Sequence, residues 1–206
     1  MWILSLKLII KIEHISQEAP YKKLTDFYLK ALNKNQDCIE AISISSFNIA
    51  SKEVDSRYVN LKFISNDEFI FFSNYDSAKA SAFNSHNQIA ALFHWPSINI
   101  QIRMKAKVKK TSKDFNQKYF FDRSEKKNAL AISSNQSKPI DSYNQVQKNY
   151  NQSLQNNDLK KCPEYWGGYS FTPYYFEFWE GHESRVNKRE VFEKIDGVWK
   201  HLFLQP

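Results

Sequence analysis

INIQIRMK, residues 98–105, alternates apolar and polar side chains without a break. Successive side chains of a β-strand point to opposite faces, so this pattern predicts a strand with one buried and one polar face. Strands of this kind are typical of antiparallel sheets that cover a core on one side. The stretch therefore predicts a largely antiparallel β structure.

Further strands are predicted on both sides of this stretch. Upstream they fall around Ile42 and Ile44, over 57–63, over 68–73 after a turn at Asn66-Asp67, and over 88–95. Downstream they fall over 169–180, 189–195 and 198–204, and Asp196-Gly197 between the last two is a strong hairpin signal. Most of these strands are joined by short turns, which favours an antiparallel barrel.

Helices are predicted in four places. Pro20 can begin an amphipathic helix whose apolar residues recur at i, i+3 and i+4 through Leu32. Shorter patterns indicate helices at 77–83, 112–123 and 142–156. The fold class is α+β, a mostly antiparallel barrel with flanking helices. Since no linker or repeat divides the chain, we expect a single domain over 20–206 behind an N-terminal extension, 1–19.

The composition excludes several classes of site. The chain of 206 residues has only 4 glycines, and it contains neither GxGxxG nor GxxxxGK[ST], which argues against dinucleotide and P-loop sites. Its net charge of +7 suits a phosphorylated ligand, but the basic residues are scattered, and no nucleic acid partner is expected. No metal is expected either, because the 5 histidines and 2 cysteines show no ligand spacing.

The first residues, MWILSLKLIIK, are the one place where a membrane could be involved. This apolar run is much shorter than the ~20 residues of a spanning helix and is interrupted by Lys7. It lacks the basic leader and the cleavage site of a signal peptide. With so few cysteines, the expected location is the cytoplasm, with no membrane partner.

Several cationic and aromatic residues could bind a phosphate. Arg57 and Lys62 are expected on opposite faces of one strand, and Lys79 begins a helix whose free N–H groups favour an anion. Tyr119 and Arg123 share a helix face at i, i+4 and could hold one phosphate between them. Taken singly, each cation is better explained by a surface salt bridge and each aromatic residue by packing. A ligand site requires these residues to converge, which spacing alone does not show.

Residues 177–189, EFWEGHESRVNKR, combine an aromatic plane with the two guanidinium groups of Arg185 and Arg189. Together with earlier motifs, this segment resembles the pyridoxamine 5′-phosphate oxidase family. The motifs stand in register from about Pro20 to Pro206: RYVNLK at 57–62, FFSNYDSAK at 71–79, Gln101, KYFFDR at 118–123, NQS at 135–137 and WGGY at 166–169.

The resemblance implies a split β-barrel homodimer with FMN at the subunit interface. It implies oxidation of pyridoxamine or pyridoxine 5′-phosphate to pyridoxal 5′-phosphate, with O2 as acceptor. The implied FMN-binding residues are Arg57, Tyr58, Val59, Asn60, Leu61, Lys62, Phe72, Ser73, Lys79, Gln101, Gln136, Ser137, Trp179 and Arg189. The implied substrate-binding residues are Lys62, Tyr119, Arg123, Lys127, Arg185 and Asn187, with Arg185 as the catalytic residue.

The chain departs from the family pattern mainly on the substrate side. Asn187 replaces a histidine, Lys127 a serine, Ala78 a basic residue, and Ser170 an arginine, and residues 203–206 read FLQP instead of RLAP. Asparagine cannot carry the charge of a histidine, so the substrate contact changes. Two alternatives therefore stay open: an FMN-dependent oxidase of another reduced ring, as in phenazine biosynthesis, and a non-catalytic protein that binds flavin or pyridoxal phosphate.

Overall fold

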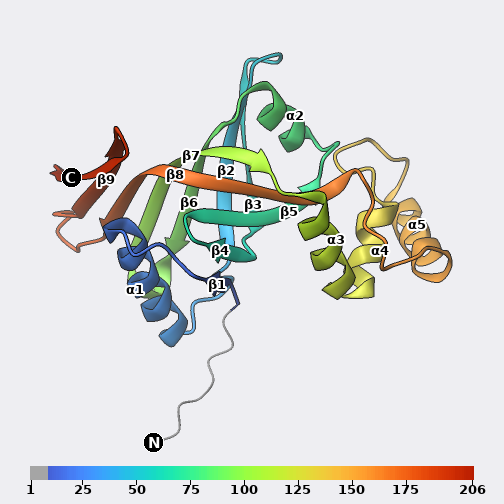
Figure 1. Cartoon of the computed structure of the whole chain (residues 1–206), viewed down its shortest axis with the longest axis horizontal. Coiled ribbons are helices and arrows are strands. Elements are labelled where there is room, and N and C mark those ends of the chain that lie inside the picture. The colour runs from blue at the N-terminus through green and yellow to red at the C-terminus, as the bar shows by residue number, and fades with distance from the viewer. Residues whose placement is uncertain (1–8) are drawn as a thin grey trace, which may run out of the picture.

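The structure is a computed structural model that describes residues 9–206. Residues 1–8 of the predicted N-terminal extension lie outside the described residues. Within residues 9–206 the chain forms five α-helices, a 3-10 turn and one sheet of ten strands, which makes it a mixed α+β fold (Figure 1). Among these residues, no helix is long and apolar enough to cross a membrane.

The elements follow one another with short connections. Their bounds are β1 Lys11–Glu13, α1 Ala19–Asn33, β2 Ala41–Asn48, β3 Glu53–Asn60, β4 Phe63–Ser65, β5 Glu68–Asn74, α2 Ala78–Ser85, β6 Gln88–Trp95, the 3-10 turn Pro96–Ile98, β7 Ile100–Lys110, α3 Lys113–Asp122, α4 Glu125–Ser133, α5 Tyr143–Asn156, β8 Trp166–Glu180, β9 Lys188–Ile195 and β10 Val198–Leu204.

The sheet has the order β1-β4-β5-β8-β7-β6-β2-β3, and β9 pairs with β8 and with β10. All pairs are antiparallel except β1 with β4. The prediction of a mostly antiparallel sheet is therefore confirmed. The path of paired strands is open, however, so hydrogen bonds do not close the sheet into the expected barrel.

The predicted strand over 57–63 is interrupted, which corrects the expectation that Arg57 and Lys62 share one strand. β3 ends at Asn60 and β4 begins at Phe63. Between them the chain changes partners: the Leu61 N–H donates to the Glu40 carbonyl at 2.9 Å, and the Lys62 N–H donates to the Ile70 carbonyl at 2.8 Å. This two-residue corner joins the β2 side of the sheet to the β5 side.

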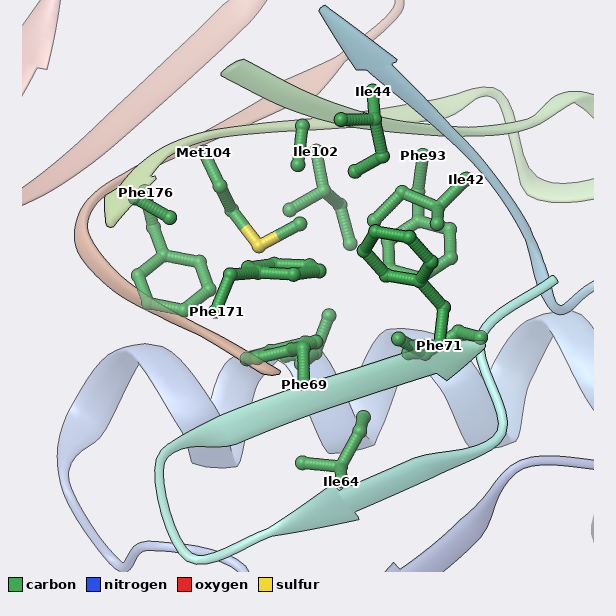
Figure 2. Close-up of a cluster of buried hydrophobic side chains, with 14 of the residues drawn as sticks. Ile42, Ile44, Ile64, Phe69, Phe71, Phe93, Ile102, Met104, Phe171 and Phe176 are labelled. Atoms are coloured by element: carbon green, nitrogen blue, oxygen red, sulfur yellow. The ribbon is translucent and has the colours of Figure 1, made fainter. Parts of the chain in front are cut away.

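One core lies between the curved sheet and α1. Ile100, Ile102 and Met104 of the opening alternation are buried there, and Ile98 is partly buried at its edge. Ile102 and Met104 lie beside the stacked rings of Phe69 and Phe171, whose centroids lie 5.1 Å apart (Figure 2). The predicted helix at Pro20 is α1, whose Phe27 ring packs against the sheet. Burial of these large side chains accounts for the one-sided pattern of the strands.

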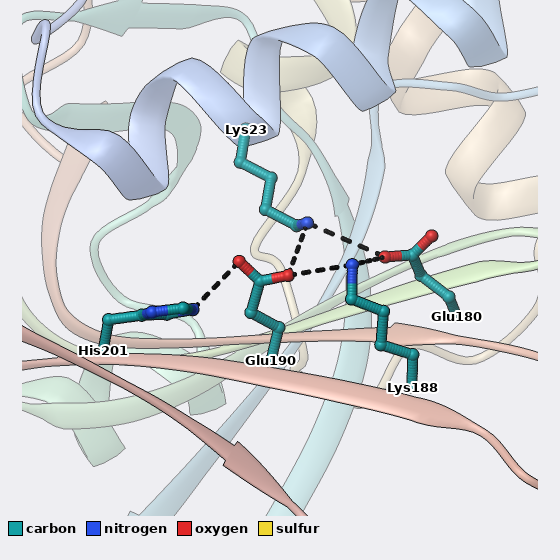
Figure 3. A network of polar contacts seen from close by, with 5 residues as sticks. All are labelled: Lys23, Glu180, Lys188, Glu190 and His201. Atoms are coloured by element: carbon teal, nitrogen blue, oxygen red, sulfur yellow. Dashed lines mark hydrogen bonds and ion pairs between the residues drawn. The ribbon is translucent and has the colours of Figure 1, made fainter.

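A charged network attaches α1 to the C-terminal hairpin formed by β9 and β10. The Lys23 ammonium lies 2.8 Å from Glu190 and 3.7 Å from Glu180, and Lys188 bridges the same two carboxylates (Figure 3). The His201 ring contacts Glu190 at 3.1 Å. Burial raises the pKa of Glu190, but hydrogen bonds from Lys23 and Lys188 outweigh it, so the net pKa is lowered and the carboxylate stays charged.

The helices α3, α4 and α5 lie together at the end of the sheet where β8 begins (Figure 1). The helices predicted at 112–123 and 142–156 are α3 and α5, and the one predicted at 77–83 is α2. The sequence did not predict α4. Its only buried residues are Asn128 and Ala129, so it carries no apolar stripe that a periodicity search could detect.

Candidate functional site

A cavity of about 800 Å³ opens beside the corner between β3 and β4. Its walls come from β1, β3, β4, β5, α2, α3 and the beginning of α4. It brings together eleven of the predicted site residues: Tyr58, Val59, Asn60, Lys62, Phe72, Ser73, Lys79, Tyr119, Arg123, Lys127 and Gln136.

The cavity is strongly positive. Six of its lining residues are lysine or arginine, and two, Glu13 and Asp122, are acidic. Burial lowers the pKa of Lys62; Glu40 opposes this shift, and the charges of Lys127 and Arg123 add to it. Within residues 9–206 no salt bridge involves Lys62, Arg123 or Lys127. Three cations that repel one another without an acidic partner favour a bound anion.

Lys79 forms a second cationic group at the start of α2. Its side chain is 9% exposed, and its ammonium donates to Ser73 Oγ at 3.1 Å and to Ser77 Oγ at 3.3 Å. Burial, followed by the charge of Arg57, lowers the pKa of Lys79. No carboxylate in the described part of the chain forms an ion pair with it. A buried cation paired only with hydroxyls is costly, and an anionic ligand would offset that cost.

The backbone beside Lys79 also suits an anion. The Ser77 side chain makes no capping hydrogen bond to the first turn of α2. Gln136 lies nearby and accepts hydrogen bonds from Ser73 Oγ at 3.2 Å and from the Asn74 N–H at 3.3 Å. The next residue, Ser137, lines a separate hollow of about 280 Å³ at the start of α2. An uncapped helix start and a buried ammonium together form a donor set for a phosphate.

Stacked rings form the wall next to the Lys62 group. The Tyr119 and Phe72 rings lie 3.8 Å apart with an interplanar angle of 12°, and the Trp166 ring lies behind Phe72 at 5.1 Å. The Arg123 guanidinium lies over Trp166 at 5.1 Å. Burial raises the pKa of Tyr119 although Arg123 lowers it, so the phenol stays protonated and can donate to an anion.

Eight predicted site residues do not line this cavity: Arg57, Leu61, Gln101, Ser137, Trp179, Arg185, Asn187 and Arg189. The Arg57 guanidinium instead donates to Ser46 Oγ at 2.8 Å and to the Ile44 carbonyl, and it pairs with Asp55. The Leu61 side chain is completely buried.

Gln101, Trp179 and Arg189 lie in one row across β7, β8 and β9, because the register pairs Gln101 with Trp179 and Trp179 with Arg189. Arg189 Nε donates to Glu177 at 2.9 Å. Burial raises the pKa of Glu177, but hydrogen bonds from Arg189 and Tyr175 and the charge of Arg103 outweigh it, so the net pKa is lowered. The charged Glu177 therefore holds Arg189 in place.

The row and the cavity lie toward opposite ends of β8. Trp166, which lies behind Phe72 of the cavity wall, begins this strand, and Trp179 comes thirteen residues later, about 40 Å along the strand path. The loop after β8 carries Arg185, at a φ of 60°, and Asn187, whose Oδ1 accepts the His182 N–H at 3.0 Å. One chain alone does not bring these residues to the cavity.

The cavity also contains residues that sequence reasoning missed: Lys11, Glu13, Phe63, Phe115, Lys118, Asp122 and Ser124. Lys118 and Asp122 adjoin the predicted pair Tyr119 and Arg123 on α3, so helical periodicity could have indicated them. No signal was available for Lys11, because it reaches the cavity through the pairing of β1 with β4, about fifty residues away in sequence.

Comparison with known proteins identifies relatives over about nine-tenths of the chain. A family model described as the pyridoxine 5′-phosphate oxidase C-terminal dimerisation region matches residues 166–206. Pyridoxine/pyridoxamine 5′-phosphate oxidase 1 of Hydrogenovibrio crunogenus is 33% identical over 194 residues, which cover 92% of this chain and 89% of that protein. The pyridoxine/pyridoxamine 5′-phosphate oxidase of Caulobacter vibrioides is 32% identical, with coverage of 92% and 86%.

Solved structures share the fold. PhzG from Burkholderia lata, in complex with tetrahydrophenazine-1-carboxylic acid, superposes with a TM-score of 0.86 at 21% identity, over 91% of this chain and 92% of that one. A pyridoxamine 5′-phosphate oxidase-related, FMN-binding protein from Nostoc punctiforme gives a TM-score of 0.76 at 12% identity, over 92% and 99%. By its likeness to the two oxidases over nine-tenths of its length, the chain belongs to the pyridoxine/pyridoxamine 5′-phosphate oxidase family.

Proposed function

We propose that the protein is an FMN-dependent oxidase that converts pyridoxamine or pyridoxine 5′-phosphate to pyridoxal 5′-phosphate with O2 as acceptor. The observation that carries the proposal is the presence of two cationic groups in one cavity, Lys79 at the start of α2 and Lys62 with Arg123 and Lys127. A flavin phosphate and a substrate phosphate need two such groups. FMN is supported by family membership and by the printed name of the Nostoc punctiforme relative.

The residues present suit both ligands. Lys79, Ser73 and the first turn of α2 would bind the FMN phosphate, and Gln136 would lie beside them. Lys62, Arg123 and Lys127, with the Tyr119 hydroxyl, would hold the substrate phosphate by charge-assisted hydrogen bonds. The chemistry that FMN would supply when bound is hydride acceptance, and the residues of the chain would hold and orient the substrate.

The complete site would require two chains. Gln101, Trp179, Arg185, Asn187 and Arg189 lie away from the cavity of their own chain, which supports a homodimer in which the partner supplies them. The match of residues 166–206 to a dimerisation region supports the same assembly. In this proposal residues 20–206 form one FMN-binding split-barrel domain. The β2 side and the β5 side of its sheet are joined at the Leu61–Lys62 corner.

The direct test is the spectrum and the reaction of the purified protein. We expect a yellow protein with flavin absorbance that forms pyridoxal 5′-phosphate and hydrogen peroxide from pyridoxine 5′-phosphate in air. Without oxygen, the substrate should bleach the flavin band. A colourless protein that added FMN cannot reconstitute would contradict the proposal.

A second candidate is an oxidase of another reduced ring. Asn187 favours it, because its side chain is engaged by the loop backbone and offers no titratable group to a pyridine ring. The same assay separates the two: bleaching by a reduced ring compound without a phosphate, and none by pyridoxine or pyridoxamine phosphate, would select the second. A flavin band that no substrate bleaches would select a non-catalytic binding protein.

Lys62 gives the proposed reaction a defined dependence on pH. Only the protonated ammonium attracts the substrate phosphate, and burial lowers its pKa from the ordinary 10.5, so the charge is lost at a lower pH than for an exposed lysine. We expect the KM for pyridoxine 5′-phosphate to rise as the pH increases through this lowered pKa. In Lys62→Arg, whose guanidinium stays charged, the alkaline rise should be absent. Identical profiles for the two proteins, measured by initial rates, would show that Lys62 does not bind the phosphate.

A further inference from the structure

The Arg123 side chain is held from three directions. Its Nη1 donates to the Lys127 carbonyl at 2.8 Å and to Asn128 Oδ1 at 3.2 Å, and its plane lies over the Trp166 ring. A guanidinium has five N–H groups, and these two bonds use both that Nη1 carries. Within residues 9–206, Nε and Nη2 of Arg123 have no hydrogen-bond partner. These two nitrogens form the edge that binds two oxygens of a phosphate at once.

Asn128 is the buried member of this arrangement. It lies in the first turn of α4 and is 0% exposed. Its Nδ2 donates to the carbonyls of Phe120 and Leu159, each at 2.8 Å. The reverse orientation of the amide would place Oδ1 against these two carbonyl oxygens, so Nδ2 must face them. Oδ1 is then directed to Arg123.

We propose that Asn128 is a positioning residue for substrate binding, which orients the Arg123 guanidinium so that its Nε–Nη2 edge is presented to the substrate phosphate. The inference rests on the proposed function and adds to it a residue that does not itself line the cavity. An arginine on a flexible stem loses rotamer entropy when it binds. The acceptor on Asn128 removes part of that cost beforehand by fixing the side chain in its binding orientation.

The test is Asn128→Ala in the FMN-loaded protein, with pyridoxal 5′-phosphate as the binding probe. We expect the dissociation constant of the probe and the KM for pyridoxine 5′-phosphate to rise about tenfold, the effect of one hydrogen bond to a charged group. The kcat and the affinity for FMN should be unchanged. Asn116→Ala is the matched control: Asn116 is also buried, but it bonds to Thr111, Tyr75 and Gly168 instead of Arg123, so the probe should bind as to the wild type.

A double-mutant cycle separates positioning from a general loss of structure. In the Arg123→Lys background, where Nη1 is absent, Asn128→Ala should have no further effect on probe binding. Equal effects of Asn128→Ala with and without Arg123 would overturn the inference, as would unchanged binding in the single variant. If Asn128→Ala does not fold, Asn128→Ser takes its place, since its hydroxyl can still donate to one buried carbonyl but is too short to reach Arg123. If the FMN-loaded wild type binds no pyridoxal 5′-phosphate, the proposed function itself fails.

Discussion

Replacing Lys79 with methionine is expected to raise the melting temperature of the FMN-free protein while weakening FMN binding about 10- to 100-fold. In the absence of a ligand, the hydrogen bonds that the buried Lys79 ammonium makes within residues 9–206 go to the hydroxyls of Ser73 and Ser77. Methionine has a similar length and carries no charge, so it removes the desolvation cost. It also removes the cation that would bind the cofactor phosphate.

Two measurements check this expectation, thermal unfolding without FMN and titration of FMN by the quenching of its fluorescence. With FMN in excess, the order of stability should reverse, because the ligand stabilises only the protein that binds it tightly. Lys22→Met, which removes an exposed lysine of α1, is the control and should change neither quantity. An unchanged FMN affinity in Lys79→Met would place the cofactor phosphate elsewhere.

Mixing two inactive variants, Arg123→Ala and Arg185→Ala, is expected to restore activity. Arg123 lines the cavity, and Arg185 lies on the loop after β8, away from the cavity of its own chain. In a heterodimer one site combines the intact cavity of one chain with the intact Arg185 of the other. Because random association makes half of the dimers mixed, with one working site of two, activity should reach roughly a quarter of the wild-type value.

The result depends on which chain supplies Arg185. Each variant alone should bind FMN and show little turnover. The variants are mixed by unfolding and refolding together, and differently tagged chains verify that heterodimers form. Heterodimers without activity would mean that Arg123 and Arg185 of the same chain act together. A mixture of two Arg185→Ala preparations is the control and should stay inactive.

The sequence predicted most of the strands because their signal is local. From Ile100 to Lys105 the polarity of each residue indicates the face of β7 on which it lies, whereas Ile98 and Asn99 fall in the preceding turn and were wrongly predicted as strand. The Asp196-Gly197 turn requires positive φ angles, and both residues have them. The corner at Leu61 and Lys62 has no such signal, since the alternation continues through it while the hydrogen-bond partners change. Whether the first and last strands of the sheet pair with each other to close a barrel depends on tertiary structure, so no local sequence pattern could predict it.

In the candidate site, too, the residues that share a local pattern could be predicted, and those brought together only by folding could not. Tyr119 and Arg123 could be paired from helical spacing, and the structure brings them to one cavity. Asn128 could not be found, because its role depends on carbonyls of α3 and of Leu159 that only the folded chain brings together. Spacing also could not reveal that Trp166 and Trp179 lie at opposite ends of β8, the first behind the cavity and the second in the row with Gln101 and Arg189.

The central position of β8 determines when the chain can fold during synthesis. β8 pairs with β5, β7 and β9, yet it begins only at Trp166. Until the ribosome has released residues 166–180, β5 and β7 each have one unpaired edge, and the large aromatic side chains of the core stay exposed to solvent. The nascent chain must therefore remain largely uncollapsed or be protected by chaperones until at least the first 180 of its 206 residues have been made, and any chain truncated before β8 is expected to aggregate.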